Sequence, residues 1–342
     1  MDTLQEVLHA YSIRPFYIEK QTERLYMVQD YNQQYALKHS RLTEETIVMW
    51  EQVYKLAYEE YLFPILPVYL TKQGKLYEKK GELIYYVTPW KESRETELDQ
   101  STIDKIFQSF GLIHMKTKRR HLVEIQQFKQ AFQQYKQHCL TLQQQLLTFV
   151  EEYEQHRFMS PFELLVCTQF KDVNYSLNET IRRIDQLLDE QEETWYYSLC
   201  HKNIKTSHTL VDQGQLYFIN WENAGFDYPV FDLVAFFQEE TKHYDTPTIM
   251  LLRGFDKYMN ENELTKKELY LLVIQLLDPQ AYLSCVKNHK QANTSMLKQI
   301  IHLQHTFRRI LFGLHLSAHV EKTYDTIDLD DLDDLDDLDE TD

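Results

Sequence analysis

The apolar side chains near the N-terminus change from a helical to a strand spacing. Within residues 1–12, four of them recur every three or four positions and predict a short amphipathic helix: Leu4, Val7, Leu8 and Tyr11. Residues 15–39 then contain three short apolar runs, separated by polar segments and by the turn-forming sequence Asp30-Tyr31-Asn32. This second pattern predicts three strands, the last of which is Tyr35-Ala36-Leu37-Lys38.

A helix is predicted from Thr43 to about Tyr58, because Thr43 can cap its first turn and the next two glutamates suit the positive end of its dipole. Three short apolar runs follow and predict strands over residues 68–70, 76–77 and 83–87. Gln73-Gly74 supplies a turn between the first two, and Pro89-Trp90 ends this region. Residues 1–90 are therefore expected to form a small antiparallel sheet with two helices.

Most of the remaining chain has helical spacing. Residues 101–104 are expected to cap a helix that reaches His114, and helical patterns also cover residues 121–160, 176–191, 249–252, 263–277 and 295–316. Asp278-Pro279 breaks the pattern before the last of these. The Gln- and Lys-rich helix over residues 121–160 is either a plain amphipathic helix of the core or a docking helix for a partner.

One stretch within this helical region has the pattern of strands and loops. Residues 195–200 are aromatic and fit a strand or a helix end. Two short apolar runs, 209–211 and 216–220, flank Asp212-Gln213-Gly214-Gln215, whose Asp and Gly are typical of a tight hairpin. A sheet-forming N-terminal part and a mostly helical C-terminal part together predict the α+β class.

The composition excludes several classes of function. A formal net charge of −17 leaves no basic excess to neutralise phosphates, so a nucleic-acid partner is not expected. The four cysteines lie far apart and form no C-x-x-C motif, which favours free thiols over disulfides or a zinc site. Neither a secretory signal nor a run of about 18 apolar residues occurs, so we expect neither secretion nor a membrane span.

The C-terminal residues 324–342 differ sharply from the rest of the chain. Residues 325–342 contain eleven Asp or Glu and no Lys or Arg, so they carry −11 of the −17. Leucines recur at every third position, a spacing that fits neither a helical stripe nor a strand: Leu329, Leu332, Leu335 and Leu338. Because like charges repel, we predict a disordered acidic tail that either keeps the protein in solution or binds basic partners or Ca²⁺.

The region from residue 201 to residue 233 resembles the catalytic block of the aminoglycoside phosphotransferase and choline kinase branch of the protein-kinase-like fold. That branch has a loop H-G-D-x-x-x-x-N, a hairpin, the motif I-D-W-E and a later F-D-L. Here the loop is HKNIKTSH over residues 201–208, and the hairpin follows. Ile219-Asn220-Trp221-Glu222 and Phe231-Asp232-Leu233 then occupy the places of the two later motifs.

The resemblance implies a bilobal fold, with a small antiparallel N-lobe over residues 1–90, a mostly helical C-lobe over residues 91–323 and the tail. It also implies that Lys38 corresponds to the strand lysine that binds nucleotide phosphates, although it could equally be a surface lysine at a strand end. The glutamate that pairs with this lysine would lie on the next helix. Glu51 is the first choice, and the alternatives are Glu44, Glu45 and Glu59.

The loop over residues 19–24, which would cover the phosphates, contains no glycine. The residue types also differ from the family pattern at the positions that carry out phosphoryl transfer in such enzymes. Asn203 replaces the aspartate that accepts the proton of the acceptor hydroxyl, and an amide is no general base near neutral pH. His208 and Asn220 replace the two Mg²⁺ ligands, and neither offers the anionic oxygen that Mg²⁺ prefers.

Lys202 and Lys205 make the loop basic rather than metal-binding. We therefore expect no intact catalytic or metal site and no cofactor; ATP and Mg²⁺ would be needed only by an atypical phosphotransferase. Three residues with structural roles are retained. The resemblance implies that His201 packs within the loop, that Trp221 fills the core beside it and that Asp232 hydrogen-bonds its backbone.

The size of the chain and the block WENAGFDYP with the following FDL are similar to the spore-coat kinase-like (CotS-type) family of endospore-forming Bacillales. Membership implies synthesis in the mother-cell cytoplasm, incorporation into the spore coat and other coat proteins as partners. The sequence thus predicts a pseudokinase with a structural or assembly role. The alternatives are an atypical phosphotransferase that phosphorylates a small-molecule hydroxyl from ATP, and a pseudokinase sensor that binds nucleotide through Lys38.

Overall fold

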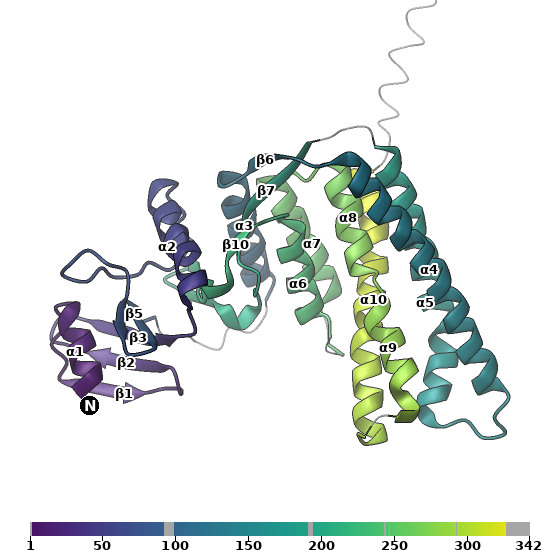
Figure 1. Ribbon diagram of the computed structural model, residues 1–342, viewed down its shortest axis with the longest axis horizontal. Coiled ribbons are helices and arrows are strands. Elements are labelled where there is room, and N and C mark those ends of the chain that lie inside the picture. Colours follow the sequence, from purple (N-terminus) through teal and green to yellow (C-terminus); the bar gives the residue numbers. More distant parts are fainter. Residues whose placement is uncertain are drawn as a thin grey trace, which may run out of the picture. The chain divides into compact units, whose positions relative to one another are not determined.

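The computed structural model describes residues 2–91, 99–190, 194–242, 244–245, 247–291 and 293–325. Its helices and strands (Figure 1) form two compact units. Unit 1 consists of Met1–Arg120, Tyr196–Ala235 and Arg253–Asn262, and unit 2 of His121–Trp195, Phe236–Leu252 and Glu263–Asp342. Residues 326–342, which make up nearly all of the predicted acidic tail, lie outside the described residues.

Unit 1 begins with helix α1 and a five-stranded antiparallel sheet, which confirms the predicted helix and its first three strands. Helix α1 spans Asp2–Ala10, and the strands are β1 (Tyr17–Lys20), β2 (Leu25–Gln29), β3 (Gln34–Ser40), β4 (Glu78–Lys80) and β5 (Leu83–Pro89). Their order in the sheet is β1-β2-β3-β5-β4. Val7 and Leu8 of α1 are fully buried against Val28, Leu37 and Val87 of the sheet.

Helix α2 (Glu44–Glu59) follows β3, and its N-cap is Thr43, as predicted. The strands predicted over residues 68–70 and 76–77 are wrong, because these residues are irregular and Tyr69 makes a single backbone bond to Val87, 2.8 Å long. β5 pairs with β3 on one side, and the polar β4 is the edge strand that pairs with it on the other. Edge pairing of this kind depends on long-range contacts more than on local apolar content.

The second part of unit 1 contains helix α3 (Gln100–Lys116) and most of the strands around the loop 201–208. Asp99, rather than residues 101–104, caps α3: its carboxylate accepts from Thr102 N at 2.7 Å. Residues 194–200 form strand β7 (Thr194–Cys200), which pairs with β10 (Gly225–Asp227); β6 (Arg119–Leu122) completes that sheet.

The predicted hairpin is confirmed as β8 (Thr209–Asp212) and β9 (Gln215–Phe218). Gln213 and Gly214 both have positive φ, 48° and 83°, as a two-residue hairpin turn of this hand requires. Short 3-10 turns precede and follow the hairpin, η1 (Thr206–His208) and η2 (Trp221–Asn223).

Helices dominate the second half of the chain. They are α4 (Ile125–Glu154), α5 (Pro161–Asp189), α6 (Val230–Glu240), α7 (Thr248–Glu261), α8 (Lys266–Leu276), α9 (Gln280–Asn288) and α10 (Met296–Tyr324). The prediction placed the start of α5 too late, because it missed the capping box in which Ser160 and Glu163 satisfy each other's backbone N–H groups. It also missed α9, which follows the correctly predicted break at Asp278-Pro279.

Within unit 2, α4 and α5 lie side by side over most of their length (Figure 1). Residues Lys266–Gln291 are long and apolar enough to cross a membrane by composition, but 67% of their most apolar window is buried inside the protein. The break between α8 and α9 also interrupts them. A buried, interrupted stretch is typical of a core, which agrees with the expectation of no membrane span.

Candidate functional site

The loop 201–208 starts directly after β7, and Asp232 in the first turn of α6 anchors its backbone. One carboxylate oxygen of Asp232 accepts a hydrogen bond from His201 N at 2.5 Å, and the other accepts from Lys202 N at 2.8 Å. Burial alone would raise the pKa of this fully buried carboxyl. The neighbouring His114 and His201, with the backbone bond, instead lower its pKa below the ordinary value, so Asp232 is ionised.

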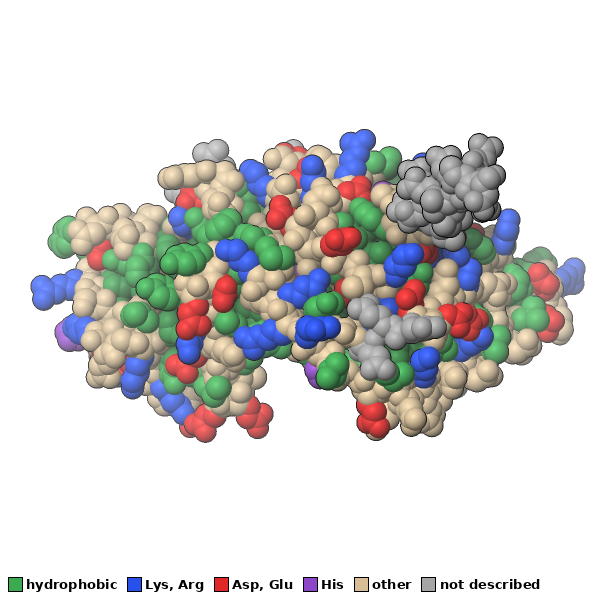
Figure 2. Space-filling model, turned by 90° about the horizontal axis from the view of Figure 1, so that it is seen from above, with side chains coloured by type: hydrophobic (Ala, Val, Ile, Leu, Met, Phe, Trp, Pro, Cys, Tyr) green, Lys and Arg blue, Asp and Glu red, His purple; other side chains and the backbone are tan. Residues whose placement is uncertain are grey.

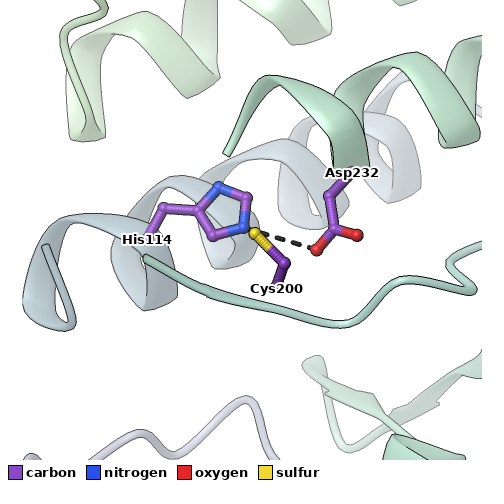
Figure 3. A group of neighbouring side chains, drawn as sticks. All are labelled: His114, Cys200 and Asp232. Carbon is purple, nitrogen blue, oxygen red and sulfur yellow. Dashed lines mark ion pairs between the residues drawn. The ribbon is translucent and has the colours of Figure 1, made fainter. Parts of the chain in front are cut away.

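His114, Cys200 and Asp232 form a buried cluster beneath the loop (Figure 3). His114 Nε2 lies 3.5 Å from the Asp232 carboxylate, and His114 Nδ1 lies 2.9 Å from the hydroxyl of Tyr258. Burial raises the pKa of Cys200 well above its usual value, and its sulfur lies 3.5 Å from the Asp227 carbonyl oxygen. The carboxylate of Asp232 is already bound to two backbone N–H groups, which indicates a structural cluster rather than a metal site.

Two buried histidines brace the loop from inside. His201 Nε2 donates to the Ile219 carbonyl at 2.8 Å, and its Nδ1 accepts from Asn203 N at 3.3 Å. His208 Nδ1 donates to the Asn203 carbonyl at 2.6 Å. Burial lowers the pKa of both rings, that of His208 to about 4, so both are neutral near pH 7.

The position of the missing catalytic base is therefore a fixed but uncharged part of the loop. The backbone of Asn203 is held by His201 and His208, while the residue itself is exposed. Its neighbour Lys202 has a positive φ of 60° and forms an ion pair with Asp227, 2.9 Å long. The amide of Asn203, at the position of the catalytic base, cannot accept a proton from a hydroxyl near neutral pH.

Lys38 is the centre of the second part of the site. Its ammonium group donates to Asn220 Oδ1 and to Glu222 Oε1, the latter over 2.5 Å. The hydroxyl of Tyr86, directly opposite Lys38 across the β3–β5 pair, donates to the same glutamate oxygen at 2.9 Å. Asn220 adopts the left-handed conformation, with φ 68°, which turns the chain so that Asn220 and Glu222 both meet Lys38.

Burial and ion pairing shift the pKa values of Lys38 and Glu222 in opposite directions. Burial lowers the pKa of Lys38, and Glu222 raises it in part. Burial would raise the pKa of Glu222, but Lys38 and Tyr86 bring it below the ordinary value. Lys38 and Glu222 therefore form a charged pair with limited access to water, the side chains being 23% and 14% exposed.

The partner predicted for Lys38, Glu51, is thus replaced by Glu222. Among the contacts of the described residues, Glu44 pairs with Lys79 and Glu59 with Lys55, and none joins α2 to Lys38. Helix α2 instead presents aromatic rings toward the strand: the rings of Trp50 and Tyr86 lie 5.1 Å apart. The sequence signal for Glu222 was its place two residues after Asn220, on the same tight turn as Trp221.

Trp221 is buried, and its ring lies 4.7 Å from the ring of His201. Its indole N–H donates to the Phe218 carbonyl at 3.1 Å. Trp221 therefore links the end of the hairpin to the loop.

A cavity of about 930 Å³ opens beside Lys38 within unit 1. Leu25, Met27 and Ala36 line one side of it, and Leu210 and Ile219 line another. The β1–β2 loop at its rim is closed on itself, since Thr22 Oγ1 accepts from both Arg24 N and Leu25 N. The loop's N–H groups at these positions are consequently not available to a phosphate.

The residues at the metal positions do not fit the Mg²⁺ that kinase-like enzymes use. Asn220 offers only an uncharged amide oxygen, and that oxygen accepts a hydrogen bond from Lys38. His208 offers a nitrogen, which Mg²⁺ disfavours, and that ring is tied to the loop backbone. We therefore derive no metal-assisted step from this arrangement.

Comparison with known proteins identifies relatives in sequence and in fold. The profile of the choline/ethanolamine kinase family matches residues 89–331, which include the loop, the hairpin, Asn220, Glu222 and Asp232. No curated protein matches the chain in sequence.

Three solved structures illustrate the likeness in fold. An aminoglycoside phosphotransferase from Alicyclobacillus acidocaldarius has 15% identity and a TM-score of 0.68, and the match covers 93% of this chain and 96% of that one. An AMP-bound spectinomycin phosphotransferase has 13% identity and a TM-score of 0.55, over 92% and 98%. An amicoumacin kinase has 15% identity and a TM-score of 0.53, over 90% and 92%. These matches confirm the predicted α+β fold of kinase-like phosphotransferases.

Proposed function

Since this chain belongs to the choline/ethanolamine kinase family, yet has no acidic residue at its catalytic-base or metal positions, we propose that it is a pseudokinase of that family. The chemistry of Asn220 supports this proposal most strongly. At a metal position, Asn220 offers an uncharged amide oxygen in place of a carboxylate, and that oxygen already accepts a hydrogen bond from Lys38.

The loop supports the same conclusion. Asn203 cannot accept a proton from a hydroxyl, and His208 is neutral and donates to the loop backbone. Restoration of the acidic pattern tests this point: the triple variant Asn203→Asp, His208→Asn, Asn220→Asp should gain Mg²⁺ binding that the parent lacks. Mg²⁺ binding by the parent protein that persists after deletion of residues 326–342, measured by calorimetry, would contradict the proposal.

The biological role we propose is that of a structural or assembly protein of the bacterial spore coat, made in the mother-cell cytoplasm. It rests on the resemblance of the WENAGFDYP block to spore-coat kinase-like proteins, and other coat proteins would be its partners. A fluorescent fusion in an endospore-forming host should localise to the coat, and Asn203→Ala should localise equally. A fusion that stays in the mother-cell cytoplasm through coat assembly would rule this role out.

The cavity beside Lys38 favours a second candidate, a pseudokinase that binds a nucleotide without transferring phosphate. Its volume of about 930 Å³ suits a ligand of that size, and its walls are largely apolar. A rise in melting temperature with ATP that needs no metal and is lost in Lys38→Ala would favour this candidate over a pure scaffold. The atypical small-molecule phosphotransferase remains the third candidate, and it requires measurable turnover.

A further inference from the structure

A second large cavity of unit 1 lies along the C-terminal half of α2 and the segment that follows it. It has a volume of about 820 Å³, and its lining is almost entirely apolar or aromatic. Several of the lining side chains are unusually exposed for their size: Tyr58 (83%), Tyr61 (79%), Phe63 (57%) and Leu70 (57%). Hydrophobic side chains also gather on the face of Figure 2 over the part that α2 occupies in Figure 1.

Tyr61 is held in a backbone conformation that normally favours glycine. Helix α2 ends with Leu62 N donating to Ala57 O at 2.9 Å, and Tyr61, the residue before Leu62, has a φ of 52°. This position after a helix is usually glycine, because a Cβ is strained there. The ring of Tyr61 recovers little of that strain by packing, since most of it is exposed. A strained, exposed aromatic residue is therefore better explained by contact with a partner than by the folding of this unit.

The charges around the groove indicate what kind of partner fits. Glu51 lines the groove, and Glu59 and Glu60 are exposed at its edge. Among the described lining residues Lys55 is the basic one, and it lies 3.8 Å from Glu59. Lys116 donates to the Glu60 carbonyl at 2.8 Å, which leaves the three carboxylates in excess of the two lysines. Aromatic rings beside carboxylates suit a cation carried on an apolar segment, through cation–π contacts and charge attraction. The chain's own acidic C-terminal residues would be repelled.

We propose that this groove is a docking site for a partner protein, which inserts apolar anchors between the tyrosines and places Lys or Arg against the acidic edge. The proposal deepens the assembly role given above, because it names the surface through which that role would act. It makes no use of Lys38 or the loop 201–208. Binding to the purified protein tests it, whereas localisation to the coat tests the role, so the two can fail separately.

The probe is a synthetic amphipathic peptide of about twelve residues, with leucine and phenylalanine anchors on one face and arginines on the other. Its binding to the full chain is measured by fluorescence anisotropy, beside a matched peptide in which glutamates replace the arginines. We expect the arginine peptide to bind about tenfold or more tightly than the glutamate peptide. Equal binding of the two peptides would contradict the proposed charge preference.

Variants then place the binding in the groove, since any attraction of the peptide to the acidic tail is the same in all of them. Tyr61→Gly should weaken binding about fivefold or more while raising the melting temperature, because glycine relieves the strained backbone. Tyr58→Ser should weaken binding with little change in melting temperature. Tyr175→Ser, which removes an equally large ring that is 59% exposed on α5, should change neither.

Two results would overturn the proposal. One is unchanged affinity in both Tyr58→Ser and Tyr61→Gly. The other is a lower melting temperature for Tyr61→Gly, because Tyr61 would then be retained for the stability of unit 1 rather than for a partner.

Discussion

At the scale of single residues, uncharged side chains stand where phosphotransferases of this fold have a catalytic base and metal ligands, and they take part in internal hydrogen bonds. The positions of the catalytic base and of the two metal ligands are occupied by Asn203, His208 and Asn220. The backbone of Asn203 is hydrogen-bonded to His201 and His208, and the amide oxygen of Asn220 accepts a hydrogen bond from Lys38. The sequence alone predicted these replacements, because the spacing from His201 to Asp232 is intact. It could not predict that Glu222 pairs with Lys38, since that contact depends on the left-handed turn at Asn220.

The carboxylate of Asp232 should contribute strongly to stability. Asp232→Ala leaves two backbone N–H groups of the loop without an acceptor in a buried place, and we expect the free energy of unfolding to fall by about 3 kcal/mol. Urea denaturation measures the loss. Asp227→Ala removes a half-buried carboxylate paired with Lys202 and should cost under about 1 kcal/mol. Similar losses in the two variants would contradict the anchoring role of Asp232.

The neutral ring of His208 predicts a dependence of stability on pH. Its pKa is about 4 in the folded protein against 6.5 ordinarily, so the unfolded chain binds more protons between these values. The free energy of unfolding should therefore fall as the pH drops from 6.5 to 4, by about 2–3 kcal/mol from this residue. His208→Asn keeps a donor for the Asn203 carbonyl and does not titrate.

Urea denaturation at a series of pH values should thus show a smaller loss in His208→Asn than in the parent protein. The neighbouring His201 contributes to both proteins alike, because burial lowers its pKa as well. Identical pH profiles would mean that His208 is not held neutral by the fold.

At the scale of elements, helix α3, which carries His114, packs closely against α7. A Cβ added at Gly254 of α7 would lie 2.7 Å from Ile103 Cγ2 and still closer to the ring of Phe107. At Gly111 of α3, a Cβ would lie 2.5 Å from Glu261 Cβ. Sequence patterns located both helices but not their close contact. A glycine within a helix indicates only low helix propensity until the helix that packs against it is known.

Gly254→Ala should therefore destabilise the protein by about 2–3 kcal/mol through overpacking, although alanine favours helix formation. Chemical denaturation followed by circular dichroism measures this change. Asn260→Ala, an exposed position on the same helix, should leave the free energy of unfolding within about 0.5 kcal/mol of the parent value. A neutral or stabilising Gly254→Ala would show that α3 and α7 do not pack this closely.

At the scale of the whole molecule, unit 2 binds the start of the acidic tail through a buried arginine. Arg183 is fully buried and donates to Glu179 at 2.9 Å and to Asp325 at 2.8 Å. The hydroxyl of Tyr270 donates to the other oxygen of Asp325 at 2.8 Å. The charge pattern predicts a tail from residue 324, whereas helix α10 includes Tyr324 and is capped by Asp325. The burial of Arg183 depends on contacts between distant helices that local spacing does not reveal.

Asp325 and the residues after it should therefore differ in their effect on stability. Asp325→Ala deprives the buried guanidinium of a partner and should lower the free energy of unfolding by about 1–3 kcal/mol. Deletion of residues 326–342, which keeps Asp325, should change it by less than about 0.5 kcal/mol. Urea denaturation of the two proteins checks this, and a large loss from the deletion alone would contradict it.

The central claim, that the protein keeps a kinase fold without the kinase reaction, is tested most directly by a thermal-shift titration with ATP. It is carried out with and without Mg²⁺ or Mn²⁺, beside an assay of ATP turnover. We expect no metal-dependent rise in melting temperature and no turnover, because no acidic residue stands at the catalytic-base or metal positions. A metal-dependent rise together with turnover that Asn203→Ala abolishes would contradict it.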